Sequence, residues 1–321
     1  MANLVLPRKE YLLLTILFLF YADQSLFAQA STHPLQVITL GVQDQRGQFV
    51  SNIQPDQVVV KGVKATVRRM EVDDEPRRTL LLLDTSGSMG GPKSLSWSNV
   101  ARFAIRFCQQ RKGDDSIGLD AFAEKDQVQV PLTTDSQSLI RRTEALTISG
   151  RGRTMLGLAL TEILARRENG LRFGDAIVLV SDGERSDADK TNFGLLRDDL
   201  TRAGIRICLV RVPPIMGRGA TIEANDVSKF VKETGGIEFN LISPMVEIQP
   251  FNGALVDPDM LASTASAAYA FVQTYYRLDL EVSEPIQKPH QLKLEIVDRE
   301  RRTIQGLHLN YPNYLWPSST N

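Results

Sequence analysis

Residues 80–91 have the sequence LLLLDTSGSMGG, in which four leucines run directly into an aspartate, a threonine, two serines and three glycines. A short apolar run of this kind is typical of a strand that is buried on both faces of a sheet. The polar residues must then lie where that strand leaves the core, in a loop at the edge of the sheet. Because such loops often carry binding or catalytic residues, this loop is the first candidate functional segment.

Buried-strand patterns alternate with helical patterns from Arg78 to about Val246. This alternation predicts an α/β fold with a doubly wound, mostly parallel sheet and helices on both faces. The two strand patterns within 116–132 are too close together for a helical crossover, so they predict an antiparallel hairpin and one antiparallel edge strand. The expected strands cover 79–83, 116–122, 127–132, 176–181, 205–212 and 237–242. The expected helices cover 99–111, 136–146, 155–167, 193–203 and 226–233.

Both flanks of this region have the shorter alternation of antiparallel strands. LQVITLGV (35–42) and KATVRRMEV (64–72) precede it. After it, Asp257 and Pro258 predict the start of a helix, which is followed by strand patterns at 275–282, 290–298 and 303–311. Each strand set alone is marginal, so we predict that the two sets join in one small β-rich domain, with Val42 and Leu294 in its core. The expected organisation is a β-rich segment at 31–77, an α/β domain at 78–246 and a helix with strands at 247–321.

The N-terminus has the pattern of a signal peptide covering 1–30. Arg8 and Lys9 precede the apolar run 12–20, and Ala28 and Ala30 supply small residues in A-x-A spacing. An apolar core of about ten residues is shorter than the ~20 that span a bilayer, although a retained N-terminal anchor is the alternative. We therefore expect cleavage after Ala30, a secreted or periplasmic protein, and no stable membrane span after cleavage.

The net charge bears on the class of partner, and the two cysteines bear on the core and on possible disulfide bonding. The formal net charge is −1 and there is no basic stripe, so nucleic acid is not expected as a partner. Cys108 lies in a helical pattern and Cys208 in a strand pattern, and both are most simply buried small apolar residues. A disulfide between them stays open as an alternative, because an exported protein would meet an oxidising compartment.

Oxygen-bearing side chains follow three elements of the predicted sheet. Asp84, Ser86 and Ser88 alternate along the first loop, SGRGRTMLG (149–157) places Thr154 just before a helix, and LVSDGERSD (179–187) places Asp182 at the end of a strand. In a doubly wound sheet of order 3-2-1-4-5-6, strands one and four are neighbours, so Asp84 and Asp182 should converge at the switch point. Hard oxygen ligands of this kind favour Mg²⁺, with Mn²⁺ or Ca²⁺ as alternatives, over zinc.

DTSGSM (84–89), the threonine after a glycine-rich turn and SDG (181–183) together resemble the metal-ion-dependent adhesion site of the von Willebrand factor type A domain. The resemblance implies that family's fold over about 78–246. It also implies a divalent cation that is completed by an Asp or Glu carboxylate of a protein partner. Arg153 stands where glycine is common in the family. The metal-site residues that the resemblance implies, binding directly or through water, are Asp84, Ser86, Ser88, Thr154 and Asp182.

The flanks are also similar to a narrower group, the bacterial type A domain proteins first grouped in Acidobacteria. In that group a short strand-rich segment precedes the metal loop and further strands follow it. Here VQDQRGQFVSNIQPDQVVVKG (42–62) stands for the leading strands, and the segment from YYRLDLEV to YPNYLWP (275–317) for the trailing ones.

Two of these features have alternative structural interpretations. The DTSGS loop could be a simple helix N-cap, and Asp120 could be a structural hydrogen-bonding group, so Asp120 is left out of the ligand set. No P-loop ending GK[ST], HExxH or GxSxG occurs, and His33, His290 and His308 all lie far from the candidate loops in sequence. We therefore expect no enzyme, but an exported metal-dependent adhesion or scaffold module. The alternative is an assembly or chaperone-like subunit that uses the same site to engage an enzyme or ATPase, and the predicted export argues against a cytosolic version.

Overall fold

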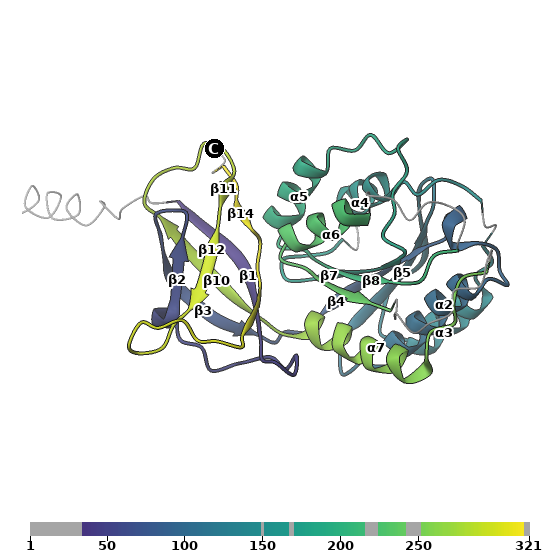
Figure 1. Cartoon of the computed structure of the whole chain (residues 1–321), viewed down its shortest axis with the longest axis horizontal. Coiled ribbons are helices and arrows are strands. Elements are labelled where there is room, and N and C mark those ends of the chain that lie inside the picture. Colours follow the sequence, from purple (N-terminus) through teal and green to yellow (C-terminus); the bar gives the residue numbers. More distant parts are fainter. Residues whose placement is uncertain (1–33, 149–150, 167–169, 216–223, 242–251, 318–321) are drawn as a thin grey trace, which may run out of the picture.

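The computed structural model describes residues 34–148, 151–166, 170–215, 224–241 and 252–317. The predicted signal peptide lies outside these residues. Figure 1 shows two parts, an α/β part on the right and a β-rich part on the left. Within the described residues, no helix combines the length and apolar content that a membrane crossing requires.

A six-stranded sheet forms the centre of the α/β part, with the strand order β6-β5-β4-β7-β8-β9. All neighbours are parallel except β5 and β6, which form the antiparallel hairpin expected at one edge. The first and fourth strands of the winding, β4 and β7, lie side by side, as a switch point between them requires. The strands are β4 (Arg78–Asp84), β5 (Ser116–Phe122), β6 (Asp126–Thr133), β7 (Ala176–Ser181), β8 (Arg206–Arg211) and β9 (Ile237–Asn240).

Helices cover both faces of this sheet (Figure 1). Successive strand residues point to opposite faces, so the leucine run of β4 supplies two cores at once. Leu81 and Leu83 pack in the cluster that includes α2 (Leu95–Gln109), α3 (Ser136–Ala145) and α7 (Pro258–Gln273). Leu80 and Leu82 pack in the cluster that includes α4 (Leu156–Ala165), α5 (Phe193–Arg202) and α6 (Ala224–Glu233). The predicted fold class is thereby confirmed.

The start of α2 differs from the prediction. The sequence predicts a helix at 99–111, whereas α2 covers Leu95–Gln109. Ser94 is its N-cap, and the Ser94 hydroxyl accepts a hydrogen bond of 3.1 Å from the Trp97 backbone N–H. The cap lets the helix begin in a segment rich in serine, where helix propensity alone gives little signal.

The β-rich part combines strands from both ends of the described chain. β1 (Leu35–Gln43) and β3 (Ala65–Asp73) flank β10 (Tyr275–Val282), all antiparallel, and β13 (His308–Asn310) extends the sheet beside β1. Val42 and Leu294 belong to one buried cluster. Two further pairs complete this part: β12 (Lys293–Ile296) with β2 (Val58–Lys61), and β11 (His290–Gln291) with β14 (Tyr314–Leu315). A short 3₁₀ helix, η1 (Pro55–Gln57), precedes β2.

Two expected strands of this part are shorter than predicted. The pattern at 290–298 is split at Leu292, because its N–H donates to the Asn313 carbonyl at 2.8 Å and so continues the pairing with the C-terminal segment, whereas pairing with β2 begins at Lys293. Of the expected strand at 303–311, only His308–Asn310 pairs as a strand. In both cases the alternating side chains are present but a long-range backbone partner decides where pairing stops.

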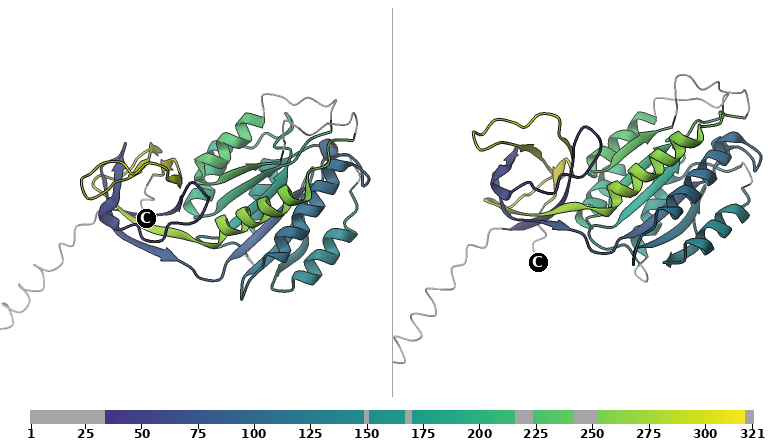
Figure 2. Two further views of the ribbon diagram at one scale, coloured as in Figure 1. Left: turned by 60° about the horizontal axis from the view of Figure 1, so that its bottom comes forward. Right: turned by 90° about the horizontal axis from the view of Figure 1, so that it is seen from below.

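Two chain segments connect the two parts, one from β3 to β4 and one from α7 to β10 (Figure 2). Since β4 begins at the first segment, the β-rich part lies at the amino ends of the parallel strands. The loops that follow β4 and β7 lie at the opposite end of the sheet. Non-covalent contacts also join the two parts: the Asn313 N–H donates to the Glu233 carbonyl at 3.1 Å, and the Arg197 guanidinium lies 4.3 Å from the centre of the Tyr314 ring.

Both cysteines are buried and unpaired in the structure. Burial raises the pKa of Cys108 to about 12 and raises the pKa of Cys208 as well. Both thiols therefore stay protonated and serve as small apolar core residues.

Candidate metal site

Backbone hydrogen bonds hold the predicted site loops against one another. β4 ends at Asp84 and continues into the 3₁₀ helix η2 (Gly87–Met89). The Gly87 N–H donates to the Gly152 carbonyl at 3.0 Å, which joins the first loop to the loop before α4. The Ser186 N–H donates to the Thr154 carbonyl at 2.9 Å, which joins that second loop to the loop after β7.

A glycine is required where the first loop turns. Gly90 has φ +75°, and a Cβ at this position would lie 2.1 Å from Ile215 Cδ1. Such a contact would force the end of the Ile215 side chain to move, and the positive φ alone would strain any residue with a side chain at this position. The glycines of the opening sequence therefore let the loop fold back over the end of the sheet.

All five predicted residues come together at the ends of β4 and β7. The Ser86 hydroxyl lies 3.1 Å from the Ser88 hydroxyl and accepts a 2.9 Å hydrogen bond from Thr154 Oγ1. Asp84 Oδ1 accepts from the Ser86 backbone N–H at 2.9 Å. Asp182 lies close enough to Asp84 for the two carboxylates to interact electrostatically. Three hydroxyls and two carboxylates from three loops thus form one polar cluster in which Asp84, Ser86, Thr154 and Asp182 are buried.

Ser181 belongs to this cluster, although sequence reasoning placed it only at the end of a strand. Its hydroxyl donates to Asp84 Oδ2 at 2.6 Å and lies 3.5 Å from Asp182 Oδ1. The same oxygen accepts a 3.1 Å hydrogen bond from the Gly183 N–H. A serine at a strand end gives no signal by itself, and only the pairing of β4 with β7 brings Ser181 beside Asp84.

The two carboxylates are crowded in a buried setting. Burial and the neighbouring Asp182 carboxylate raise the pKa of Asp84 to about 7. Burial also raises the pKa of Asp182, and the hydrogen bond from the Glu184 N–H opposes that rise. Asp182 Oδ2 is buried and, within the described residues, has no hydrogen-bond partner. Two like charges and one orphaned oxygen make this end of the sheet electrostatically unfavourable in the absence of a cation.

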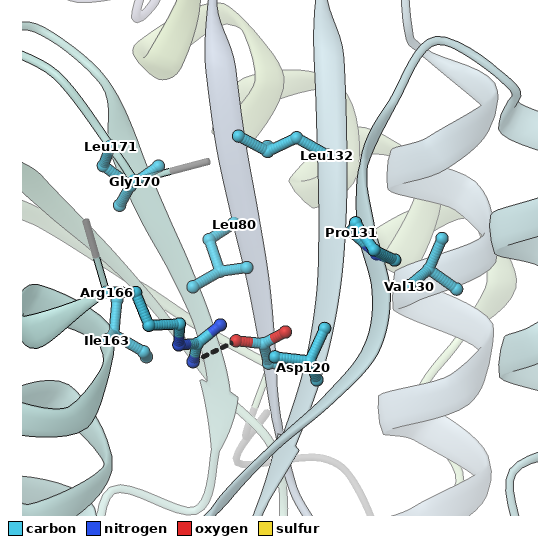
Figure 3. Close-up of a pocket in the computed structure, with 10 residues that line it drawn as sticks. Leu80, Asp120, Val130, Pro131, Leu132, Ile163, Arg166, Gly170 and Leu171 are labelled. Carbon is cyan, nitrogen blue, oxygen red and sulfur yellow. Dashed lines mark ion pairs between the residues drawn. The ribbon is translucent and has the colours of Figure 1, made fainter. Parts of the chain in front are cut away.

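Asp120, which was left out of the ligand set, points away to a separate cavity (Figure 3). Its Oδ2 lies 2.6 Å from Arg166 Nη2, although neither Asp120 oxygen has a hydrogen bond of good geometry among the described residues. Arg166 also contacts the Asp126 carboxylate. Burial raises the pKa of Asp120 and the Arg166 charge opposes the rise. The cavity has a volume of about 120 Å³ and is otherwise mostly apolar.

The chemistry of the five side chains fits a hard dication. In the described part of the chain, no group of three or more His, Cys, Asp or Glu side chains is arranged to hold a metal. The present set contains two carboxylates with three hydroxyls, so it offers oxygen atoms alone. Oxygen ligands with a combined charge of −2 suit Mg²⁺, Mn²⁺ or Ca²⁺, and soft metals have no thiolate or imidazole here.

Comparison with known families agrees with this architecture. Residues 79–184 match the family model of the von Willebrand factor type A domain, so the chain carries a domain of this family. The matched segment begins at the central strand and ends just after Asp182. The narrower similarity to the Acidobacteria-type group stays a prediction. No curated protein matches the chain.

Solved structures with a similar fold come from distant proteins. An aerotolerance-related membrane protein of Bacteroides fragilis is 16% identical, with 61% of this chain and 98% of that chain covered and a TM-score of 0.45. A von Willebrand factor type A protein of Catenulispora acidiphila is 11% identical, with 91% and 76% covered and a TM-score of 0.47. Proximal thread matrix protein 1 of the mussel byssus, with a zinc-occupied metal-ion-dependent adhesion site, is 13% identical, with 70% and 50% covered and a TM-score of 0.47.

Proposed function

We propose that this protein is an exported, metal-dependent protein-binding module of the adhesion or scaffold type. The observation that supports the proposal best is the convergence of hydroxyls and carboxylates from three loops around an orphaned carboxylate oxygen. The pattern of residues 1–30 supports export to the periplasm or outside the cell. The proposed ligands of the cation, binding directly or through water, are Asp84, Ser86, Ser88, Thr154 and Asp182.

Mg²⁺ is the proposed ion, with Mn²⁺ or Ca²⁺ as alternatives. Both Asp84 oxygens already accept hydrogen bonds, from the Ser86 N–H at 2.9 Å and the Ser181 hydroxyl at 2.6 Å. This engagement favours a role for Asp84 through water, with Ser86 and Ser88 as direct neutral ligands. An ion held mostly by neutral oxygens remains short of negative charge, so the Asp or Glu carboxylate of a partner protein would complete its coordination.

The position of the β-rich part suits this role. It lies at the amino ends of the parallel strands, whereas the proposed metal loops lie at the carboxyl ends. A partner could therefore approach the metal loops without meeting the β-rich strands, which would act as a base for the binding domain.

The test is a thermal unfolding series on the mature chain with Mg²⁺, Mn²⁺, Ca²⁺ or EDTA. At a hundredfold excess of metal over its dissociation constant, binding should stabilise the fold by about 2.7 kcal/mol. Asp84→Ala should remove this gain and leave the far-UV spectrum unchanged, because the leucines of β4 stay buried. Asp187→Ala, which removes an exposed carboxylate from the loop after β7, is the matched control and should retain the gain.

A second measurement addresses the partner. A pull-down from the exporting compartment with the wild-type chain should recover proteins in Mg²⁺ that are lost in EDTA and with Asp84→Ala. Equal recovery in all three conditions would contradict a metal-dependent binding function, and equal melting temperatures with and without metal would contradict the site itself.

A further inference from the structure

The loop before α4 carries two arginines that are not among the proposed metal ligands. Arg151 and Arg153 flank Gly152 and immediately precede Thr154. We infer that these arginines, together with Lys125, form a basic rim that selects an acidic partner segment, in which a second carboxylate lies near the one that binds the metal. The inference rests on the proposed function and names the class of partner and the residue, Arg153, that discriminates it.

The backbone fixes this rim against the metal loop. The Gly152 carbonyl accepts the 3.0 Å hydrogen bond from Gly87 N–H, between the proposed ligands Ser86 and Ser88. Gly152 has φ +101°, which a residue with a side chain rarely adopts, so a glycine at this position lets the loop turn here. Thr154 is buried in the polar cluster, whereas Arg153, its neighbour in the chain, is exposed. Arg153 therefore lies one residue from a proposed metal ligand with its side chain open to solvent.

The turn between β5 and β6 brings Lys125 to the same side. The Met155 N–H donates to the Ala123 carbonyl at 2.8 Å, which ties the start of α4 to this turn. A surface hollow of about 660 Å³ lies between the turn and the loop before α4. Its described lining residues are Ala123, Glu124, Lys125, Gln127, Arg151 and Gly152.

Charge is distributed unevenly around the site. On the β5 side, residues 123–125 and 151–153 carry three cations and one carboxylate, Glu124, a net charge of +2. On the β7 side, residues 183–190 carry Arg185 and Lys190 against three carboxylates, a net charge of −1. Arg185 already interacts with Asp226 at 3.8 Å. The carboxylates on the β7 side are Glu184, Asp187 and Asp189.

Arg153 is available for a partner in a way that Arg185 is not. The Arg153 side chain is exposed, and among the described residues the Arg153 guanidinium has no hydrogen bond or ion pair. A guanidinium can bind a carboxylate with two parallel hydrogen bonds, so it recognises a second Asp or Glu more strongly than a point charge does. A positive rim also steers an acidic segment toward the metal and raises its association rate.

The experiment uses two fluorescent peptides of equal length. One contains a single Asp among Gly, Ser and Asn, and the other contains that Asp followed by two further acidic residues. Anisotropy titrations with the full mature chain are run in Mg²⁺ and in EDTA, at low and at physiological salt. The variants are Arg153→Gln and Arg153→Lys, with Lys190→Gln as the matched control, because Lys190 is an exposed cation on the β7 side.

The triacidic peptide should bind more tightly than the monoacidic one in Mg²⁺, with a steeper salt dependence. Arg153→Gln should weaken the triacidic peptide by roughly fivefold, the size of a well-aligned exposed ion pair, and leave the monoacidic peptide unchanged. Arg153→Lys should retain part of the difference, and Lys190→Gln all of it. Equal affinity for the two peptides, or an Arg153→Gln variant that still discriminates them, would overturn the inference and leave the metal function intact. If neither peptide binds in Mg²⁺ and metal causes no melting shift, both proposals fail.

Discussion

At the amino end of the central sheet, two buried arginines donate to the carbonyls that end a helix, whereas at the carboxyl end two buried carboxylates lie side by side with no backbone donor, among the described residues, for one of their oxygens. Arg206 is 1% exposed and donates to the carbonyls of Phe271 and Val272 at 2.8 and 3.0 Å. Arg77 donates to the Gln273 carbonyl at 2.8 Å. These bonds satisfy the last carbonyls of α7, which its own helix cannot reach.

The two ends of the sheet therefore use buried charge differently. At the amino end the charged groups stabilise the fold, and at the carboxyl end they form the candidate metal site. Both guanidiniums lie over the Tyr275 ring, with Arg77 at 4.7 Å and Arg206 at 4.5 Å from its centre. Burial lowers the pKa of Arg206 to about 10, yet at neutral pH the group keeps its charge and its hydrogen bonds. At the amino end the buried guanidiniums find acceptors within the chain itself, although Arg206 Nε has no hydrogen-bond partner among the described residues. At the carboxyl end, the Arg211 charge acts to lower the pKa of Asp182, but burial outweighs it, and the five site residues supply no further positive charge.

The largest loss of stability should come from replacing a buried arginine at the amino end of the sheet. Arg206→Met should reduce the free energy of unfolding by about 3 to 5 kcal/mol, because carbonyls of Phe271, Val272 and Gly174 lose their donor in a buried setting. Urea unfolding of the mature chain measures this. Arg202→Met is the control, since Arg202 is exposed and, among the described residues, pairs with Asp199 across one helical turn, and it should cost no more than about 0.5 kcal/mol. Similar losses for both variants would contradict the structural role of Arg206.

The sequence predicted the sheet well because its signal is local. β5, β7 and β10 have the expected bounds, since each is a short apolar or alternating run between polar turns. The start of α2 was missed because a cap, and not the propensity of its first residues, decides it. The role of Arg206 was also missed, because a charged residue in a strand pattern acquires its partners only when α7 ends above it.

At the candidate site too, local sequence patterns were predictive and long-range contacts were not. The family resemblance and the spacing of polar residues named Asp84, Thr154 and Asp182, and the structure brings them together. Whether they bind a metal stays a prediction. Ser181 was not foreseen, because its contact with Asp84 depends on the register between β4 and β7. Spacing thus identifies which loops carry polar groups, whereas strand pairing decides which of those groups meet.

The next largest effect should come from replacing a carboxylate at the carboxyl end of the sheet. Asp182→Asn should remove the metal-dependent gain of about 2.7 kcal/mol that a hundredfold excess of Mg²⁺ gives. In EDTA the same variant should be at least as stable as the wild type, because it relieves the repulsion between two buried carboxylates. Ser86→Ala should weaken metal binding less, since a neutral hydroxyl attracts the cation less than a carboxylate does. Calorimetric titration of Mg²⁺ with melting curves in EDTA checks both, and a destabilised Asp182→Asn variant in EDTA would contradict the crowding argument.

A change of pH should test the same end of the sheet through the Asp84 carboxyl group. The pKa of Asp84 is about 7 in the fold against 3.8 in the unfolded chain, so between these values the folded state holds a proton that the unfolded state has lost. In EDTA the free energy of unfolding should therefore fall as pH rises from about 4 to 7, by at most about 1.4 kcal/mol per pH unit for one proton. The stabilisation by Mg²⁺ should grow over the same range, because metal and proton compete. Urea unfolding at pH 5, 6 and 7 measures both, and Asp84→Asn should have a flatter profile in EDTA.

The smallest expected effect on stability comes from removing a single hydroxyl at the amino end of the sheet. The Tyr275 hydroxyl donates to Asp73 Oδ2 at 2.6 Å. Burial acts to raise the pKa of Asp73, but hydrogen bonds from Tyr275 and Arg77 hold it below its usual value. Tyr275→Phe keeps the ring in contact with both guanidiniums and removes only this hydroxyl, so it should cost about 1 kcal/mol at pH 7.

Its pH dependence distinguishes a charge-assisted bond from lost packing. An acid whose pKa is depressed by folding stabilises the fold above its unfolded pKa and loses that contribution as pH falls through the folded value. The deficit of Tyr275→Phe relative to the wild type should therefore be present at pH 5 to 7 and shrink below pH 4, as Asp73 becomes protonated. Tyr314→Phe is the matched control, because its ring stays over Arg197 and its hydroxyl has no hydrogen bond among the described residues. If the Tyr275→Phe deficit were the same at pH 3 and pH 7, the hydroxyl would act through packing, and the polar closure of the amino end would rest on the arginines alone.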